Sequence, residues 1–168
     1  MKKILIAFLI TFSLPLFGNA QKINWMTFEE AVKLNETAPK KIFIDVFTDW
    51  CGWCKKMDQT TFQNKEVVDY MNEFYYAVKF NAECNDTIVF SGYTFVNAGG
   101  QNGRKGTHQL AAALLQGKLS YPSYVFMDEK NQVITVAPGY MGANDFLPVL
   151  KYIGTNAYLN QTFKDYIK

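Results

Sequence analysis

Cys51 and Cys54 are separated by two residues and flanked by tryptophans in the stretch DWCGWCKKM at residues 49–57. A pair at this spacing can hold a metal ion, close a structural disulfide or exchange electrons with other thiols. A purely structural disulfide is a poor explanation, because the stabilisation that a disulfide gives grows with the length of the loop it closes. The third cysteine, Cys84, leaves an odd number, so the cysteines do not form a complete set of structural pairs.

The metal interpretation needs more ligands than the sequence offers near this pair. A structural zinc site takes four donors, and the remaining candidates, Cys84 and the single histidine His108, are isolated. The redox interpretation fits better. A strand-like segment precedes Cys51 and a helix-like segment follows it, so Cys51 falls near a helix N-terminus, where unpaired amides and the helix dipole stabilise a thiolate. Cys51 is therefore predicted to be the nucleophile, and Cys54 can resolve the mixed disulfide.

The strand predicted before the cysteines carries a charge that needs an explanation. The segment KIFIDVFT at 41–48 is dense in β-branched and aromatic residues, which is typical of a strand covered on both faces in a parallel sheet. Asp45 lies inside this apolar run, and an isolated buried carboxylate is costly without a use. Asp45 is predicted to be functional; the alternative is a structural ion pair with Lys79, which falls in a second buried strand at 76–81.

Local sequence signals predict the other elements. Thr27 and Glu30 fit a capping box that starts a helix from about Phe28 to Asn35. Segment 64–74 has helical spacing with Asn64 as its cap. Four more elements are expected: a hairpin at 86–97 around Ser91-Gly92, a helix at 107–116 with His108 as a surface or capping residue, antiparallel strands at 123–127 and 133–137, and a helix capped by Asn144. The last fifteen residues are expected to form a further amphipathic helix.

The first twenty residues have the composition of a secretory signal peptide. A short basic start precedes an apolar run and a small-residue ending at Ala20. The run is interrupted and short for a membrane span, so a retained anchor is the weaker alternative. Cleavage would leave residues 21–168, a length suited to a single domain. Of the 17 Lys and Arg residues, losing Lys2 and Lys3 leaves 15, which balance the 15 Asp and Glu and offer no charge for nucleic acid or an anionic membrane surface.

The stretches FIDVFTDWCGWCKKM, VKFN and YPSYVFMDEKNQV together resemble the thioredoxin superfamily, and within it the exported thioredoxin-like disulfide oxidoreductases of bacteria. The resemblance covers about residues 41–150. It implies an α/β fold, a three-layer α/β/α sandwich around a mixed central sheet, here with an inserted hairpin or loop at about 84–106. It also implies a periplasmic or otherwise exported location.

The resemblance assigns roles to residues at the cysteine pair. It implies that Cys51 is the exposed nucleophile and Cys54 the buried resolving thiol. Asp45 matches the buried acid that manages the proton of the resolving cysteine, and Lys79 matches its cationic neighbour. No metal and no organic cofactor is needed for this chemistry.

The resemblance also implies a surface that binds substrate. Trp50 matches the tryptophan beside the nucleophile, and exposed aromatic rings at Trp50 and Trp53 are expected to form a docking patch. Pro122 matches the family's cis-proline, which lies against the disulfide, and Tyr121 before it would present its backbone to a partner. Packing residues at Trp50 and Trp53, and an ordinary loop proline at Pro122, are the alternatives.

Three features depart from the family pattern. Gly52-Trp53 stands between the cysteines where cytosolic thioredoxins carry Gly-Pro, so the direction of electron flow is open. The insertion is longer than in a simple thioredoxin and is interpreted as a flap that shapes substrate choice. Cys84 falls on the edge of the sheet that carries the active site, where a resolving or regulatory thiol is conceivable and a merely buried thiol is favoured.

These observations predict an exported enzyme that reduces or isomerises disulfides of envelope proteins through Cys51 and Cys54. Its partners would be proteins with disulfides or thiols and a membrane-bound electron donor, without nucleic acid and without stable membrane insertion after signal cleavage.

Two alternative functions stay open. One is a binding module or metallochaperone that holds Cu(I) between the cysteines, with His108 or Cys84 near. The other is a domain of an envelope complex that docks through its tryptophans and uses the disulfide only as a switch.

Overall fold

A computed structural model describes residues 21–99 and 106–168 of the chain. The signal peptide predicted at 1–20 lies outside the described residues. The central sheet has the order β1-β3-β2-β6-β7. Its strands are β1 (Trp25–Met26), β2 (Lys41–Phe47), β3 (Tyr75–Asn81), β6 (Ser123–Met127) and β7 (Val133–Pro138). The helices are α1 (Phe28–Thr37), α2 (Gly52–Gln59), α3 (Lys65–Phe74), α4 (Gln109–Leu114), α5 (Ala143–Gly154) and α6 (Phe163–Tyr166).

The sheet is mixed, as the sequence predicted. β1 and β2 both run parallel to β3, while β6 is antiparallel to β2 and β7 is antiparallel to β6. The register places Asp45 at the middle of the sheet, opposite Lys79 on β3 and opposite Tyr124 on β6. Because directly opposite residues share a face, these three side chains lie on the same side of the sheet.

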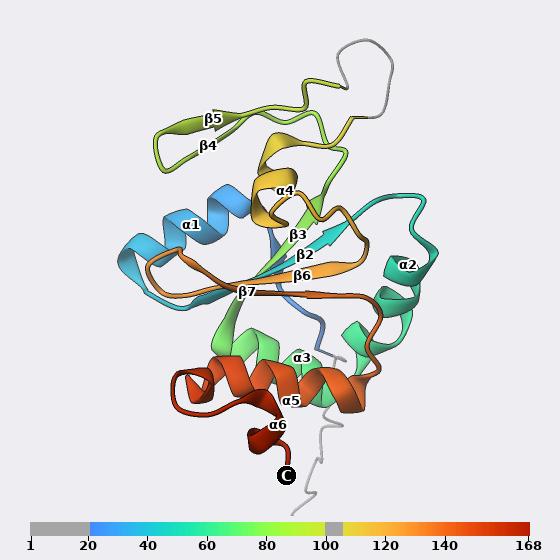
Figure 1. The fold of residues 1–168 in the computed structure, drawn as a ribbon, viewed down its shortest axis with the longest axis vertical. Helices are drawn as coiled ribbons and strands as arrows, with labels where there is room; N and C mark the ends of the chain where they lie inside the picture. Colours follow the sequence, from blue (N-terminus) through green and yellow to red (C-terminus); the bar gives the residue numbers. More distant parts are fainter. Residues whose placement is uncertain (1–20, 100–105) are drawn as a thin grey trace, which may run out of the picture.

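Helices cover both faces of the sheet, which confirms the three-layer α/β/α sandwich (Figure 1). Successive side chains of β2 point to opposite faces of the sheet. Ile42 and Ile44 belong to the core under α1 and α4, whereas Phe43 belongs to the core under α3 and α5. Both cores are fully formed, because all three of these side chains have 0% exposure. The predicted two-sided burial of this strand is confirmed.

The predicted helix starts are mostly confirmed by the contacts of their caps. The Thr27 hydroxyl accepts from the Glu30 amide, and the Glu30 carboxylate accepts from the Thr27 amide, so the capping box is complete. Asn64 accepts from two amides at the start of α3. Among the helices of residues 21–99 and 106–168, none is both long and apolar enough to cross a membrane.

The predicted hairpin is present and projects beyond α1 and α4 (Figure 1). β4 (Ile88–Phe90) pairs antiparallel with β5 (Tyr93–Phe95). The turn residues Ser91 and Gly92 have φ angles of 51° and 80°, the positive values that a tight two-residue hairpin turn requires. Phe90 anchors the hairpin to the domain, because its ring packs edge-on against Phe28 of α1 at a centroid distance of 5.0 Å.

The segment that leaves the sheet after β3 and returns before α4 has its two ends close together. They meet at a short neck formed by Glu83, Cys84, Asn97 and Gly106. The Asn97 side-chain amide donates to the carbonyls of the other three at 3.3, 3.1 and 2.8 Å. Gly106 also approaches Gly99 so closely that a Cβ on Gly106 would lie 2.5 Å from the Gly99 Cα. Only glycine therefore fits at position 106 without moving the neighbouring backbone.

Two predictions near the C-terminus are wrong. Gly142 is the N-cap of α5, no side chain caps this end, and Asn144 lies inside the helix, with Pro148 in its second turn. The last fifteen residues form the short helix η3 (Ala157–Leu159) and α6 rather than one amphipathic helix. Asn156, between the end of α5 and η3, has a φ of 61°, a left-handed conformation that interrupts a helix.

Candidate active site

Cys51 and Cys54 are joined by a disulfide at the start of α2. Cys51 is the N-cap of this helix, and its sulfur accepts a hydrogen bond from the Cys54 amide at 3.0 Å. The prediction of a helix N-terminus at Cys51 is confirmed. An anionic sulfur at this position would receive the same amide and the positive end of the helix dipole, which favour a thiolate. Cys51 is only 4% exposed, so the exposed nucleophile that the resemblance implied is not found in the disulfide form, whereas Cys54, at 2%, is buried as implied.

Asp45 lies in the core with Lys79 as its ionic partner. The Lys79 Nζ donates to the Asp45 Oδ2 at 2.6 Å, and the Asp45 side chain is only 1% exposed. Burial raises the pKa of Asp45 from 3.8 to about 6, because desolvation of the carboxylate outweighs the attraction of Lys79. A carboxyl group with this pKa can gain and lose a proton close to neutral pH.

Asp58 completes this charged cluster and was missed by sequence reasoning. Lys79 Nζ also donates to the Asp58 carboxylate, which is 44% exposed. Asp58 lies four residues after Cys54 on α2, so both project from one face of the helix. That spacing was the available signal. The negative charge of Asp58 also contributes to raising the pKa of Asp45.

Aromatic rings surround the disulfide on the outside. Trp50 and Trp53 are 60% and 61% exposed, as a docking surface requires. The Trp53 ring lies 5.3 Å from that of Tyr140 between centroids. Trp50 is held by an edge-on contact with Tyr121 at 5.9 Å and by its indole N–H, which donates to Glu83 Oε1 at 2.9 Å. Tyr140 and Glu83 were not predicted.

The segment before β6 lies beside this aromatic surface. The Tyr121–Pro122 peptide bond is cis, as the resemblance implied. The Pro122 carbonyl accepts from the Gly139 amide at 2.8 Å, which ties the turn to the end of β7. Because Tyr121 contacts Trp50, the structure brings the cis-proline turn and the cysteine loop together.

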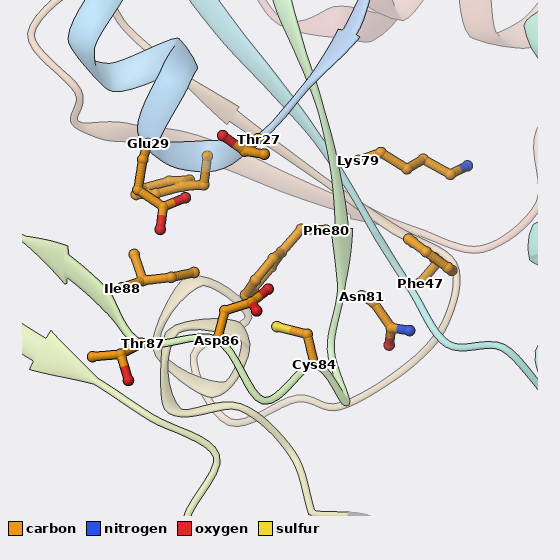
Figure 2. A pocket seen from close by; sticks show the side chains of 11 residues that line it. Thr27, Glu29, Phe47, Lys79, Phe80, Asn81, Cys84, Asp86, Thr87 and Ile88 are labelled. Carbon is orange, nitrogen blue, oxygen red and sulfur yellow. The ribbon is translucent and has the colours of Figure 1, made fainter.

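Cys84 has no disulfide partner and lies in a separate pocket of about 640 Å³ between β3 and the start of α1. Figure 2 shows its thiol directed toward the side chain of Asp86, with Asn81 on the opposite side of Cys84 and the Glu29 carboxylate further away. Desolvation, followed by the negative charges of Asp86 and Glu29, raises the pKa of the Cys84 thiol. A thiol with a raised pKa is a poor nucleophile at neutral pH.

His108 caps α4, which confirms the capping alternative of the prediction, and its side chain has 0% exposure, so it is not a surface residue. Nδ1 accepts from the Leu110 amide at 3.1 Å, and Nε2 contacts the Asp86 carbonyl at 3.0 Å. The ring therefore has Nε2 protonated, and both nitrogens are engaged. Within residues 21–99 and 106–168 no group of three or more His, Cys, Asp or Glu side chains could hold a metal ion.

A disulfide between cysteines two residues apart at a helix N-terminus is the arrangement that dithiol–disulfide exchange uses. The mixed sheet, the helix layers and the cis-proline turn define the thioredoxin fold around it. A model of the thioredoxin-like domain family matches residues 28–154. The chain belongs to this family.

Solved structures share this fold. A thioredoxin-fold protein from Helicobacter pylori has 22% identity and a TM-score of 0.60, over 90% of this chain and 89% of that one. A DsbH oxidoreductase has 18% identity and a TM-score of 0.58, over 81% and 87%. A candidate disulphide isomerase from Bacteroides thetaiotaomicron has 25% identity and a TM-score of 0.55, over 83% and 98%. A search of curated protein sequences finds no match.

Proposed function

We propose that the protein is an exported thiol-disulfide oxidoreductase that reduces or isomerises disulfides of envelope proteins. The carrying observation is the Cys51–Cys54 disulfide at the N-terminus of α2, beside the exposed Trp50 and Trp53, on a helix whose Asp58 pairs with the Lys79 partner of the buried Asp45. The thioredoxin-like family supports the redox chemistry. The signal-peptide composition of residues 1–20 supports export.

The reduced pair would act in two exchange steps. The Cys51 thiolate attacks one sulfur of a substrate disulfide, forms a mixed disulfide and releases the first substrate thiolate. Cys54 then loses its proton and attacks the Cys51 sulfur, which restores the Cys51–Cys54 disulfide and releases the second substrate thiolate. Two electrons pass from the cysteine pair to the substrate, and the leaving thiolates take up protons from water.

Asp45 is proposed to accept the proton of Cys54. Its pKa of about 6 leaves the carboxyl group mostly ionised at neutral pH, so a proton can be taken up there. Lys79 would hold one carboxylate oxygen in place while the other receives the proton. Asp58 links the same lysine to α2 and to the surface.

The exposed rings would dock the polypeptide around the substrate disulfide. Trp50 and Trp53 each directly precede one of the cysteines in the sequence, and each has a second ring packed against it. Backbone groups of Tyr121 beside Pro122 would contact the substrate chain. Large aromatic surfaces of this kind lose little conformational entropy on binding, which suits a surface that accepts several substrates.

Reduction is the proposed direction, with electrons supplied by a membrane-bound reductase. The test is the equilibrium of the Cys51–Cys54 pair with glutathione, measured on residues 21–168 with Cys84→Ser alongside. A strongly reducing pair supports the proposal, whereas a strongly oxidising one assigns the protein to disulfide formation. Failure to form the disulfide favours the Cu(I) alternative.

A second test uses cysteine variants. Cys54→Ser should trap substrates as mixed disulfides. Partner binding that survives replacement of both cysteines by serine would favour the docking-domain alternative.

A further inference from the structure

β7 is an edge strand of the central sheet and carries no charged residue. Among the strands that the structure describes, only β6 pairs with it. Proteins usually protect an edge strand by charge, by shortness or by proline, because its unpaired backbone groups can bind another extended chain. The opposite edge is short, since β1 has only two residues. β7 has six, four of them β-branched, and its single proline stands at the end.

The ladder with β6 decides which backbone groups of β7 face outward. The Gly139 amide donates to the Pro122 carbonyl, and hydrogen-bonded pairs of this kind recur at every second residue of an antiparallel ladder. Ala137 therefore directs its backbone groups toward β6, whereas Val136 directs its N–H and C=O away from the sheet. Pro138 falls in the same outward set, where its missing N–H costs no hydrogen bond of the sheet.

A groove of about 470 Å³, here called the edge groove, lies against this outward side of β7. One wall is β7, which contributes Ile134, Val136 and Pro138. The other wall is the segment between α4 and β6, with Leu115 as an apolar residue and Lys118 as a charged one. Binding pockets for small molecules have volumes of about 300–1,000 Å³, so the edge groove has room for part of an extended chain.

Hydrogen bonds and burial hold the second wall in place. Leu115 at the end of α4 is buried. The Gly117 amide donates to the Ala112 carbonyl at 2.9 Å, and Gly117 has a φ of 74°, the left-handed conformation that commonly ends a helix. Next to β6, the Ser123 hydroxyl donates to the Ser120 carbonyl at 2.8 Å. Binding to a groove with fixed walls requires little ordering of the protein.

The edge groove is continuous with the surface that is proposed to dock substrates. Ser120 and Ser123 line the groove and stand on the two sides of the cis-proline turn. Two residues after Pro138, the ring of Tyr140 contacts Trp53. A polypeptide that is bound at the cysteines is therefore beside one end of the edge groove, and its chain can continue along β7.

The charge of the edge groove favours one kind of occupant. Of the described residues that line it, Lys118 alone is charged, and this exposed lysine makes no ion pair with any described residue. An acidic side chain on the bound chain would complement it. β7 of a second copy has no acidic residue to offer, so pairing between two β7 strands lacks this complement.

We propose that the edge groove is an accessory binding site for an extended segment of the substrate protein. The segment pairs with the outward N–H and C=O of Val136, places an aliphatic side chain against Leu115 and directs an acidic residue to Lys118. The inference rests on the proposed function and narrows its substrate class to proteins that carry such a segment near the disulfide. The edge groove adds affinity and does not touch the reacting sulfurs.

The test compares two disulfide probes that are reduced by the reduced protein. The core probe is a short peptide closed by one disulfide. The extended probe adds the segment Asp-Val-Thr-Val at either end, through a Gly-Ser linker of about ten residues that spans roughly 18 Å. Such a linker gives an effective concentration of about 1 mM, so a segment that binds the edge groove with a Kd of about 0.1 mM should raise the second-order rate constant about tenfold.

Two changes should remove most of this gain. Methylation of the backbone nitrogens of the segment removes its donors and leaves the protein unaltered. Lys118→Glu replaces attraction by repulsion, and a probe with lysine in place of the aspartate should recover the gain in this variant. Lys130→Glu is the matched control, because Lys130 is exposed in the turn before β7 and does not line the edge groove. It should keep the full gain.

The two proposals fail in different ways. Failure to reduce the core probe refutes the proposed function. Equal rates for the core probe and both extended probes overturn the inference, as does a gain that survives methylation or Lys118→Glu. A readout without catalysis is the nuclear magnetic resonance spectrum of the oxidised protein with the segment alone: the Val136 amide signal should shift and saturate, and an unchanged signal at millimolar peptide overturns the inference.

Discussion

Asp45→Asn should make the oxidised protein more stable at neutral pH. Burial raises the pKa of this carboxyl group from 3.8 to about 6, so the folded protein binds a proton more tightly than the unfolded chain does. Between these two pKa values the folded state holds more protons than the unfolded state, and stability must fall as the pH rises. The contribution of Asp45 is fully present below the unfolded pKa and is lost as the pH rises through about 6.

The magnitude follows from the size of the shift. One pKa unit corresponds to about 1.4 kcal/mol, so the rise of roughly two units costs about 3 kcal/mol of unfolding free energy above neutral pH. Asparagine keeps the size of the side chain and an oxygen that can accept from Lys79, and it does not titrate. Lys79 also keeps its partner Asp58.

Urea denaturation of the oxidised Asp45→Asn variant and the unaltered protein, at about pH 4.5 and about pH 7.5, measures this effect. The stability difference between the two proteins should move in favour of the variant by about 2 kcal/mol between these pH values. Asp69→Asn, which alters an exposed ion pair with Lys65, should give a small difference that is the same at both. An equal difference at both pH values for Asp45→Asn would refute a raised pKa.

Two further predictions concern the insertion and the helix cap that follows it. At neutral pH Cys84 should react with iodoacetamide several-fold more slowly than an unstructured cysteine, because its pKa is raised; mass spectrometry follows the modification, and faster reaction would contradict the burial of the thiol. His108→Ala should lower the free energy of unfolding by about 1–2 kcal/mol through loss of the α4 cap, and His108→Asn, which can still cap the helix, should lose less in the same denaturation assay.

The position of the cysteines could be predicted from sequence because it depends on local signals. A strand of apolar residues, a short turn and a helix without breakers place Cys51 at a helix start, and the structure has this arrangement. Asp45 was conspicuous for the same reason, as a charge in an apolar run. A structural ion pair between Asp45 and Lys79 was the alternative interpretation of this charge, and the sheet register places the two residues opposite each other.

The missed residues act across elements that are distant in the sequence. Glu83 bonds Trp50 from the loop after β3, and Tyr140 contacts Trp53 from the loop after β7. Neither contact follows from spacing or propensity, because each depends on where two loops meet. The burial of His108 was not predicted because the Asp86 carbonyl, which covers the capping ring, belongs to the insertion.

The neck at Asn97 makes the segment beyond it exchangeable. Because one side-chain amide joins the carbonyls on both sides, the chain departs from the sheet and returns at the same place. The cost of closing a loop grows only slowly with its length, so a graft of different size at this junction is expected to be tolerated where it replaces the contacts that Ile88 and Phe90 make with the core. Glu83 belongs to the neck and holds Trp50, so a graft that keeps it preserves the edge of the active site. The junction is a point at which this domain can acquire new recognition segments and retain its redox chemistry.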